Sequence, residues 1–131
     1  MNFFIVNQNQ ESAYEDEVGK RYHYPRSIPN GKKIAVGDVL IFNMSKSDAR
    51  KKGDENKRIS GIAKIENIDL FIQNRKEHAI ATYEWFVGFE DFLTFSDIGG
   101  DPRNNIQNAM SLIPKEDIAE ILLGLIRKNV R

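Results

Sequence analysis

The chain has 131 residues, of which 40% are hydrophobic and 29% charged, as expected of one globular domain. It contains no cysteine and only two histidines, which excludes disulfide frameworks, thiolate zinc sites and three-histidine metal sites, so we expect no metal or other cofactor. The net charge is zero, but residues 1–64 carry 12 basic and 8 acidic side chains. This asymmetry favours one basic face and excludes the strongly basic profile of a non-specific nucleic-acid binder.

Nothing in the sequence marks a membrane segment or a leader. No apolar run approaches the ~18 residues that cross a bilayer. Residues 1–10 lack the basic start and the small-residue cleavage site of a signal peptide. We therefore expect a single cytoplasmic domain with no membrane partner.

Three strands are predicted in the first half of the chain. Residues 2–6 form a run of aromatic and β-branched side chains, residues 39–44 form a second apolar run, and residues 58–68 form a third. Between the first two runs, residues 11–30 hold too many prolines and aromatic residues for a stable helix. This segment is expected to be extended or looped.

The second half is expected to add strands and to end in a helix. Residues 45–58 are highly charged and predict a loop with one helical turn, residues 80–95 predict one or two aromatic-rich strands, and a short helix is expected near residues 105–110. After Pro114, acidic residues and then apolar residues at helical spacing predict a C-terminal helix. Strands followed by a terminal helix indicate an α+β fold, a small mixed barrel or sheet.

The residues show no catalytic constellation. None of the seven serines lies in a strand–turn–helix elbow, and neither His23 nor His78 has a spacing that ties it to a serine. The Gly99-Gly100 pair lacks the lysine of a phosphate-binding loop. We therefore predict no catalytic residue and a protein that is not an enzyme.

Aromatic residues interleaved with basic ones give the stronger indication of function. Tyr22 and Tyr24 stand two residues apart, so they share one side of an extended chain, and Trp85 is the only tryptophan. Flat rings hold an unpaired or flipped nucleobase by stacking, which is worth ~1–3 kcal/mol per base. The same three rings could equally fill the core, and both interpretations stay open.

Polar residues near these segments suit the edges and the backbone of a nucleic acid. Asn7 and Gln8 follow the first strand, and their amides offer both a donor and an acceptor to a base edge, although a structural role in the loop is the alternative. Six basic residues are candidate phosphate contacts, with a merely solvated charged surface as the alternative: Arg21, Arg26, Arg50, Lys51, Lys52 and Arg58.

The order of these segments resembles a known superfamily. The likeness rests mainly on Tyr22–Pro25 and on Gly37-Asp38 before an apolar strand, and the aromatic segment 81–95 and residues 105–114 extend it. The chain is similar to the EVE-like modules of the PUA-like superfamily, which includes EVE, YTH, ASCH and SRA domains. The likeness covers nearly the whole chain and is strongest to the modules of modification-dependent restriction systems.

This resemblance implies a fold and a function. The fold would be a PUA-like pseudo-barrel of about five or six mostly antiparallel strands, with flanking helices and a C-terminal helix. Such modules flip a modified base into an aromatic pocket, which would place Tyr22, Tyr24 and Trp85 in the wall and Asn7 and Gln8 at the base edge. The partner would be nucleic acid, with modified DNA favoured, and a nuclease or GTPase segment would lie in the same or a neighbouring chain.

Two other functions within the superfamily remain open. One is RNA binding. The other is an ASCH-type hydrolysis of modified nucleosides, which needs a lysine and an acid in one pocket. Lys64 and Glu66 are two residues apart and so share a strand face, but a pair of surface side chains explains them equally well.

Overall fold

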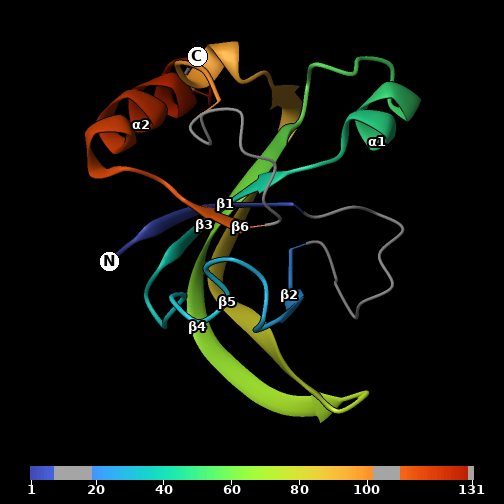
Figure 1. The fold of residues 1–131 in the computed structure, drawn as a ribbon. Helices are drawn as coiled ribbons and strands as arrows, with labels where there is room; N and C mark the ends of the chain where they lie inside the picture. The colour runs from blue at the N-terminus through green and yellow to red at the C-terminus, as the bar shows by residue number, and fades with distance from the viewer. Residues whose placement is uncertain (8–18, 102–109, 130–131) are drawn as a thin grey trace.

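The apolar runs of the sequence become the strands of one strongly curved sheet. A computed structural model describes residues 1–7, 19–101 and 110–129. Within these ranges the strands are β1 (Phe3–Asn7), β2 (Arg21–Pro25), β3 (Val39–Asn43), β4 (Ile59–Gln73), β5 (Lys76–Leu93) and β6 (Met110–Leu112). Figure 1 shows the long β4–β5 hairpin curving around the shorter strands to form a half-open barrel.

The sheet has the order β2-β5-β4-β3-β1-β6. β1 pairs with β3 in parallel, and the other four pairings are antiparallel. Register shifts in β4 near Gly61 and on both sides of Ile65 sharpen the curl, because a bulge increases the local twist of a strand. The expected α+β pseudo-barrel of mostly antiparallel strands is confirmed.

Alternating side chains bury two apolar clusters on the two faces of this sheet. We call the face that carries Phe4, Leu40 and Ala63 the inner face, because it fills the barrel. The outer face carries Ile5 and Ile41. Each strand in the middle of the sheet therefore contributes to both cores, which explains why β3 is buried along its whole length.

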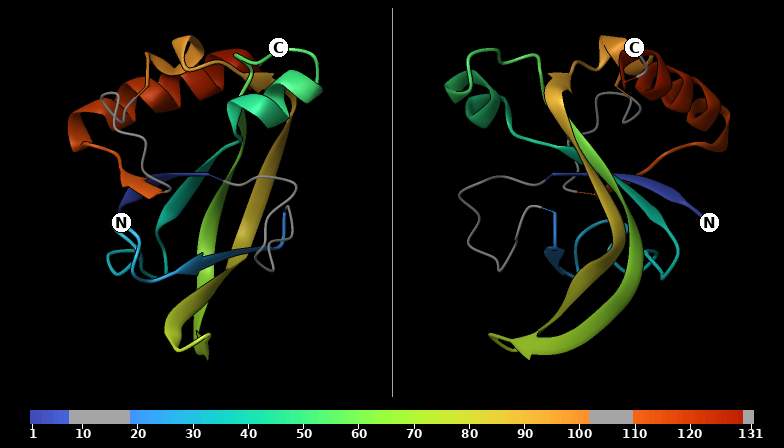
Figure 2. Two further views of the ribbon diagram at one scale, coloured as in Figure 1. Left: turned by 45° about the vertical axis from the view of Figure 1, so that its right-hand side comes forward. Right: turned by 180° about the vertical axis from the view of Figure 1, so that it is seen from behind.

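The helices lie at one end of the barrel. They are α1 (Lys46–Lys51), the short 3-10 helix η1 (Ser96–Ile98) and α2 (Lys115–Asn129). α2 covers part of the outer-face cluster through Ile121 and Leu125. Figure 2 shows α1 and α2 on opposite sides of this end, with the tip of the β4–β5 hairpin at the far end. None of the helices in the described ranges is both long and apolar enough to span a bilayer.

Three expectations about the elements are refined, and a fourth falls almost wholly outside the described residues. The extended segment before Asn30 contains β2, and the charged segment after β3 begins with α1, where one helical turn was predicted. β4 and β5 run further toward each other than predicted, because Asn74 and Arg75 connect them in two residues without any glycine as a signal. The helix expected near residues 105–110 falls outside the described residues except at Met110, which is fully buried and begins β6.

Asp38 fastens the start of β3. One carboxylate oxygen accepts a hydrogen bond from the backbone N–H of Asn2 and the other from that of Ala35, both at 2.9 Å. Gly37, at a φ of 91°, makes the turn that delivers this carboxylate. The Gly37-Asp38 pair therefore has a structural role, since its buried charge is satisfied by backbone donors.

Candidate functional site

The structure separates the three rings that were predicted to form a wall. Tyr22 and Tyr24 stack on each other with centroids 5.4 Å apart, and both belong to the inner-face core, where they are 3% and 1% exposed. Trp85 lies directly opposite Lys64 on the other face of the sheet and is 41% exposed. The sheet itself therefore stands between the tyrosines and the indole.

Asn7 lies in an amide pair at the ends of two parallel strands. Nδ2 of Asn43 donates a hydrogen bond of 2.7 Å to Oδ1 of Asn7. Asn43 is completely buried, and its own Oδ1 accepts no hydrogen bond from the residues that the structure describes. Asn43 was not among the predicted site residues. Its signal in the sequence is that two apolar strands, residues 3–7 and 39–43, both end in asparagine. Gln8 lies outside the described residues.

Four of the six predicted phosphate contacts gather around α1. Arg50 and Lys51 belong to this helix, Lys52 caps its end, and Arg58 precedes β4. The other two are placed elsewhere, since Arg21 begins β2 and Arg26 directly follows it, where it forms an ion pair with Glu77 of β5.

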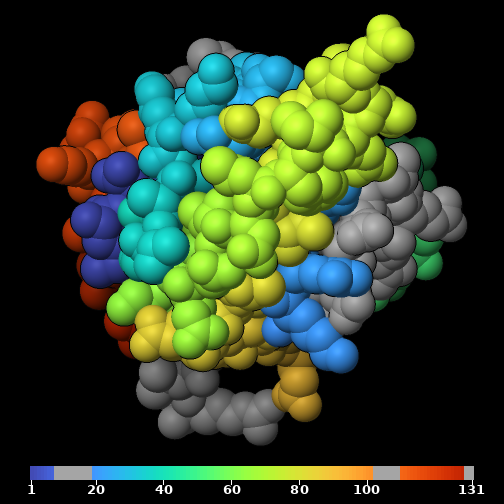
Figure 3. All heavy atoms as spheres, turned by 90° about the horizontal axis from the view of Figure 1, so that it is seen from below, coloured from blue at the N-terminus to red at the C-terminus, as the bar shows by residue number. Residues whose placement is uncertain are grey.

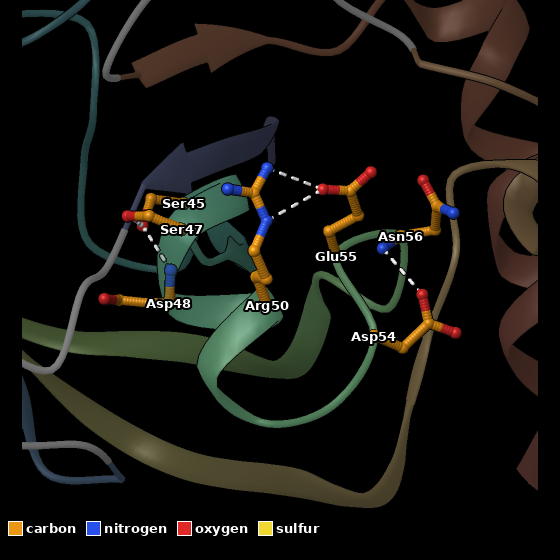
Figure 4. A network of polar contacts seen from close by, with 7 residues as sticks. All are labelled: Ser45, Ser47, Asp48, Arg50, Asp54, Glu55 and Asn56. Atoms are coloured by element: carbon orange, nitrogen blue, oxygen red, sulfur yellow. Dashed lines mark hydrogen bonds and ion pairs between the residues drawn. The ribbon is translucent and has the colours of Figure 1, made fainter.

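Local capping explains why α1 forms in this charged segment. Oγ of Ser45 accepts a hydrogen bond of 3.1 Å from the backbone N–H of Asp48, which satisfies one of the free donors of the first turn (Figure 4). Ala49 is the fully buried residue of the helix. Gly53 follows the helix in the left-handed conformation, with a φ of 111°. The helix therefore holds its basic residues on a fixed backbone.

The loop after α1 folds back on the helix. Nε and Nη2 of Arg50 donate hydrogen bonds of 3.0 and 2.7 Å to one carboxylate oxygen of Glu55, and Oδ1 of Asp54 accepts from the backbone N–H of Asn56 (Figure 4). The pKa of Glu55 is lowered, first by the hydrogen bond from Arg50 and then by the charge of Lys46. The hydrogen bonds from Arg50 and the charge of Lys46 therefore favour the ionised form of the Glu55 carboxyl.

Two of these cations lie over aromatic rings at the end of β5. Nζ of Lys52 is 5.2 Å from the ring centroid of Phe92, and Cζ of Arg58 is 5.5 Å from that of Phe95. Nε of Arg58 also donates to the backbone oxygen of Met44 at 2.9 Å, which fixes the guanidinium. We call this surface the α1 face, and define it by Lys46, Arg50, Lys51, Lys52, Lys57, Arg58, Phe92 and Phe95.

The α1 face contains two hollows. One, of about 350 Å³, is lined by Lys52, Asp54, Lys57, Glu90, Asp91 and Phe92. The second, of about 440 Å³, is lined by Lys46, Glu55, Asn56, Arg58, Thr94, Phe95 and Ser96. Both volumes lie within the ~300–1,000 Å³ range of small-molecule sites. A third hollow of about 400 Å³ lies apart from them, along the connection from β2 to β3, and includes Lys32 and Lys33.

The charge balance of the α1 segment is positive. Residues 45–58 carry six basic and three acidic side chains. Arg50 is neutralised by Glu55, and Lys57 forms an exposed ion pair of 2.8 Å with Asp91. Glu90 and Asp91 of β5 also line the smaller hollow, so the positive charge of the face gathers on α1 and at Arg58, and the two rings give it flat surfaces.

The candidate pair for hydrolysis is arranged differently from the prediction. Nζ of Lys64 lies 3.5 Å from a carboxylate oxygen of Glu84, and register shifts on both sides of Ile65 break the alternation that would have aligned Lys64 with Glu66. The lysine faces away from the barrel interior, and it lines none of the three hollows described above.

The two histidines meet each other. Nε2 of His23 and Nδ1 of His78 are 3.0 Å apart in a buried hydrogen bond, with the ring of Phe71 packed against both. This arrangement gives the two histidines a structural role, because each ring satisfies a polar atom of the other.

The fold and the site allow a comparison with known proteins. No family model matches the sequence, and no curated protein matches it. The crystal structure of ASCH from Zymomonas mobilis superimposes with a TM-score of 0.60, covering 93% of this chain and 94% of that chain at 13% sequence identity. At this identity the similarity establishes the fold alone, and it confirms the fold expected from the resemblance.

Proposed function

We propose that this chain is a nucleic-acid-binding module that uses the α1 face. The observation that carries the proposal is that Lys51, Lys52 and Arg58 gather on that face beside two phenylalanine rings, each of which lines a hollow. Exposed lysines and arginines supply most of the affinity for a phosphate backbone, and rings supply stacking surfaces for bases. The PUA-like fold at the level of the whole chain is consistent with such a module, because other members of the superfamily bind nucleic acids.

Within this proposal, the basic residues divide into two groups. Lys51 and Lys52 are exposed at the end of α1 and would contact phosphates. Arg58 is held in place by Met44 and Phe95, so its plane is fixed at the rim of the larger hollow. A fixed guanidinium above a ring is suited to stacking on a base rather than to following a flexible backbone.

The finer part of the proposal is that the larger hollow receives a modified base, favouring DNA over RNA. It offers the Arg58–Phe95 stack as one wall and the amide of Asn56 as a donor and acceptor for a base edge. Arg58 and Phe95 take the role first predicted for the tyrosines and Trp85, which the sheet keeps apart, and Asn56 takes the base-edge role first predicted for Asn7 and Gln8. We propose binding without catalysis, with any cleavage supplied by a nuclease or GTPase segment.

The test is a titration of the protein with labelled oligonucleotides, followed by fluorescence anisotropy. The panel holds one duplex DNA, the same duplex with methylated cytosine or adenine, and the matching RNA. Replacing Lys51 and Lys52 by glutamine should weaken binding about tenfold or more. Glutamine is preferred to glutamate because an acid at the end of α1 would oppose the helix dipole.

The matched control is the same double change at Lys32 and Lys33, beside the third hollow. We expect that control to bind as the wild type does. A loss confined to the control would move the interface to the β2–β3 connection and refute the α1 face. Equal affinity for plain and methylated duplexes would refute the proposed recognition of a modified base, but it would not refute the proposed binding of nucleic acid through the α1 face.

A further inference from the structure

The end of the β4–β5 hairpin stands clear of the rest of the sheet. β3 pairs with β4 only as far as Lys64, and β2 pairs with β5 only from Thr82 to His78. Beyond these positions the ribbon has two strands, which end in the pair Gln73 and Lys76. Figures 1 and 3 show this tip projecting from the body of the molecule.

The tip consists of hydrogen-bonding side chains. Its four residues, Gln73, Asn74, Arg75 and Lys76, are all exposed, and they include two positive charges and no acid. Ile72, the neighbour of Gln73, is 69% exposed. The tip therefore presents hydrogen-bonding groups, positive charge and one apolar side chain to solvent.

The turn itself favours a residue other than arginine. Asn74 and Arg75 have φ values of 51° and 64°, the left-handed conformation of a tight two-residue hairpin turn. Asparagine suits the first position, but the second normally takes glycine, because a side chain there is strained. Among the described residues, the guanidinium of Arg75 makes no hydrogen bond or ion pair that would compensate. Backbone strain of this kind is typical of functional positions.

We propose that this hairpin tip enters the major groove of double-stranded DNA. The major groove of B-form DNA is about 12 Å wide, accepts a two-stranded β-ribbon and presents a distinct pattern of donors and acceptors for each base pair, whereas the minor groove, about 6 Å wide, presents a degenerate pattern. Arginine pairs with the major-groove edge of guanine, and asparagine or glutamine with that of adenine. Duplex RNA is excluded because the major groove of an A-form helix is too deep and narrow for side chains to read.

The inference rests on the proposed function and deepens it by naming the duplex as the substrate. Figure 1 and the right-hand view of Figure 2 show α1 and the hairpin tip at opposite ends of the molecule and on the same side of each view. One duplex can therefore contact both, with phosphates on the α1 face and base edges at the tip. Contacts at two ends would also fix the orientation of the DNA.

The decisive variant is Arg75→Gly. Glycine fits the turn better than arginine, so the hairpin should be at least as stable as in the wild type, which a thermal melt checks. The probes are a short DNA duplex, an RNA duplex of the same sequence and the single DNA strand. Loss of one base-edge contact should weaken binding to the DNA duplex about five- to a hundredfold. Affinity for the single strand should be unchanged.

The control is Arg127→Gln, which also removes one positive charge, at an exposed position of α2. We expect this variant to bind the duplex as the wild type does. If Arg75→Gly binds duplex DNA as the wild type does while the Lys51 and Lys52 variant does not, the tip proposal is refuted and the α1 face stands. An equal loss for the RNA duplex or for Arg127→Gln would also refute it. A wild-type protein that binds none of the probes would refute both proposals.

Discussion

The sequence around Tyr24 is compatible with two opposite interpretations: a ring that is exposed to a ligand and a ring that is buried in the core. Its spacing from Tyr22 correctly places both rings on one side of β2, and the stacking of the two rings follows from that spacing. Alternation does not say whether that side faces solvent or the core. The structure places it in the core, where burial raises the pKa of Tyr24 to about 12 and the charge of Arg26 opposes the shift only partly.

The raised pKa predicts a specific loss of stability at high pH. The unfolded chain loses the phenolic proton near pH 10, whereas the folded chain keeps it until about pH 12, so folding stability should fall between these values. The slope from this group is at most about 1.4 kcal/mol per pH unit. Tyr24→Phe should remove it, which urea unfolding at pH 9 and pH 11 measures. Equal losses in wild type and variant would show that the phenol is not the cause.

The amide pair of Asn7 and Asn43 illustrates what one residue cannot reveal alone. Asn7 was predicted as a site residue because it follows an apolar run, whereas Asn43, at the equivalent position in β3, was not. Parallel pairing puts equivalent positions side by side, so two strands with the same ending bring their asparagines together. The pairing of strands, however, depends on contacts far apart in the chain, and periodicity carries no information about them.

At the scale of elements, α2 and η1 are joined by close backbone contact. A Cβ on Gly124 would lie 2.3 Å from the carbonyl oxygen of Asp97 and 2.9 Å from the Cα of Ile98. Lys128 adds an ion pair of 3.4 Å to Asp97. The glycine therefore sets the distance between the two helices, although it weakens α2 as a helix.

This contact predicts that Gly124→Ala is destabilising, against the ordinary preference of helices for alanine. Overpacking against backbone should outweigh the gain in propensity and give a net loss of about 1–3 kcal/mol in the free energy of unfolding. Chemical denaturation measures it. Ala119→Gly, at an exposed position of the same helix, is the matched control and should cost about 1 kcal/mol. A stabilised Gly124→Ala protein would contradict the close approach.

The elements that sequence patterns predicted are those whose stability is local. The apolar strands β1 and β3 and the amphipathic α2 carry their own signals and were placed close to their true bounds. The sequence predicts only an extended or looped segment where β2 lies. Its tyrosines and Pro25 give no clear strand signal, and the strand depends on pairing with β5. The outer half of the hairpin, with its polar tip, owes its shape to pairing alone.

At the scale of the whole molecule, the zero net charge conceals an uneven surface. The basic residues of the α1 face were visible in the sequence as charges, and four of the six predicted phosphate contacts do lie together there. The predicted aromatic wall did not assemble, because which face of the sheet a ring occupies depends on the curvature and bulges of β4 and β5. The fold could thus be predicted further than the site.

A protein with no net charge should bind nucleic acid only through this local field. With Lys51 and Lys52 as the proposed phosphate contacts, about two counterions are displaced, so log Kd should change with log salt concentration with a slope of magnitude about 2. Titrations between low and physiological salt measure the slope. A value near zero would exclude phosphate contacts as the source of affinity.

The place of β1 in the sheet has a consequence for the order of assembly. This strand lies between β3 and β6, so its two neighbours come from the middle and from near the end of the chain. During synthesis the first strand to leave the ribosome is thus the last to have partners on both edges, since one edge stays open until residues 110–112 emerge. The β4–β5 ribbon, whose halves are joined by two residues, can close long before that.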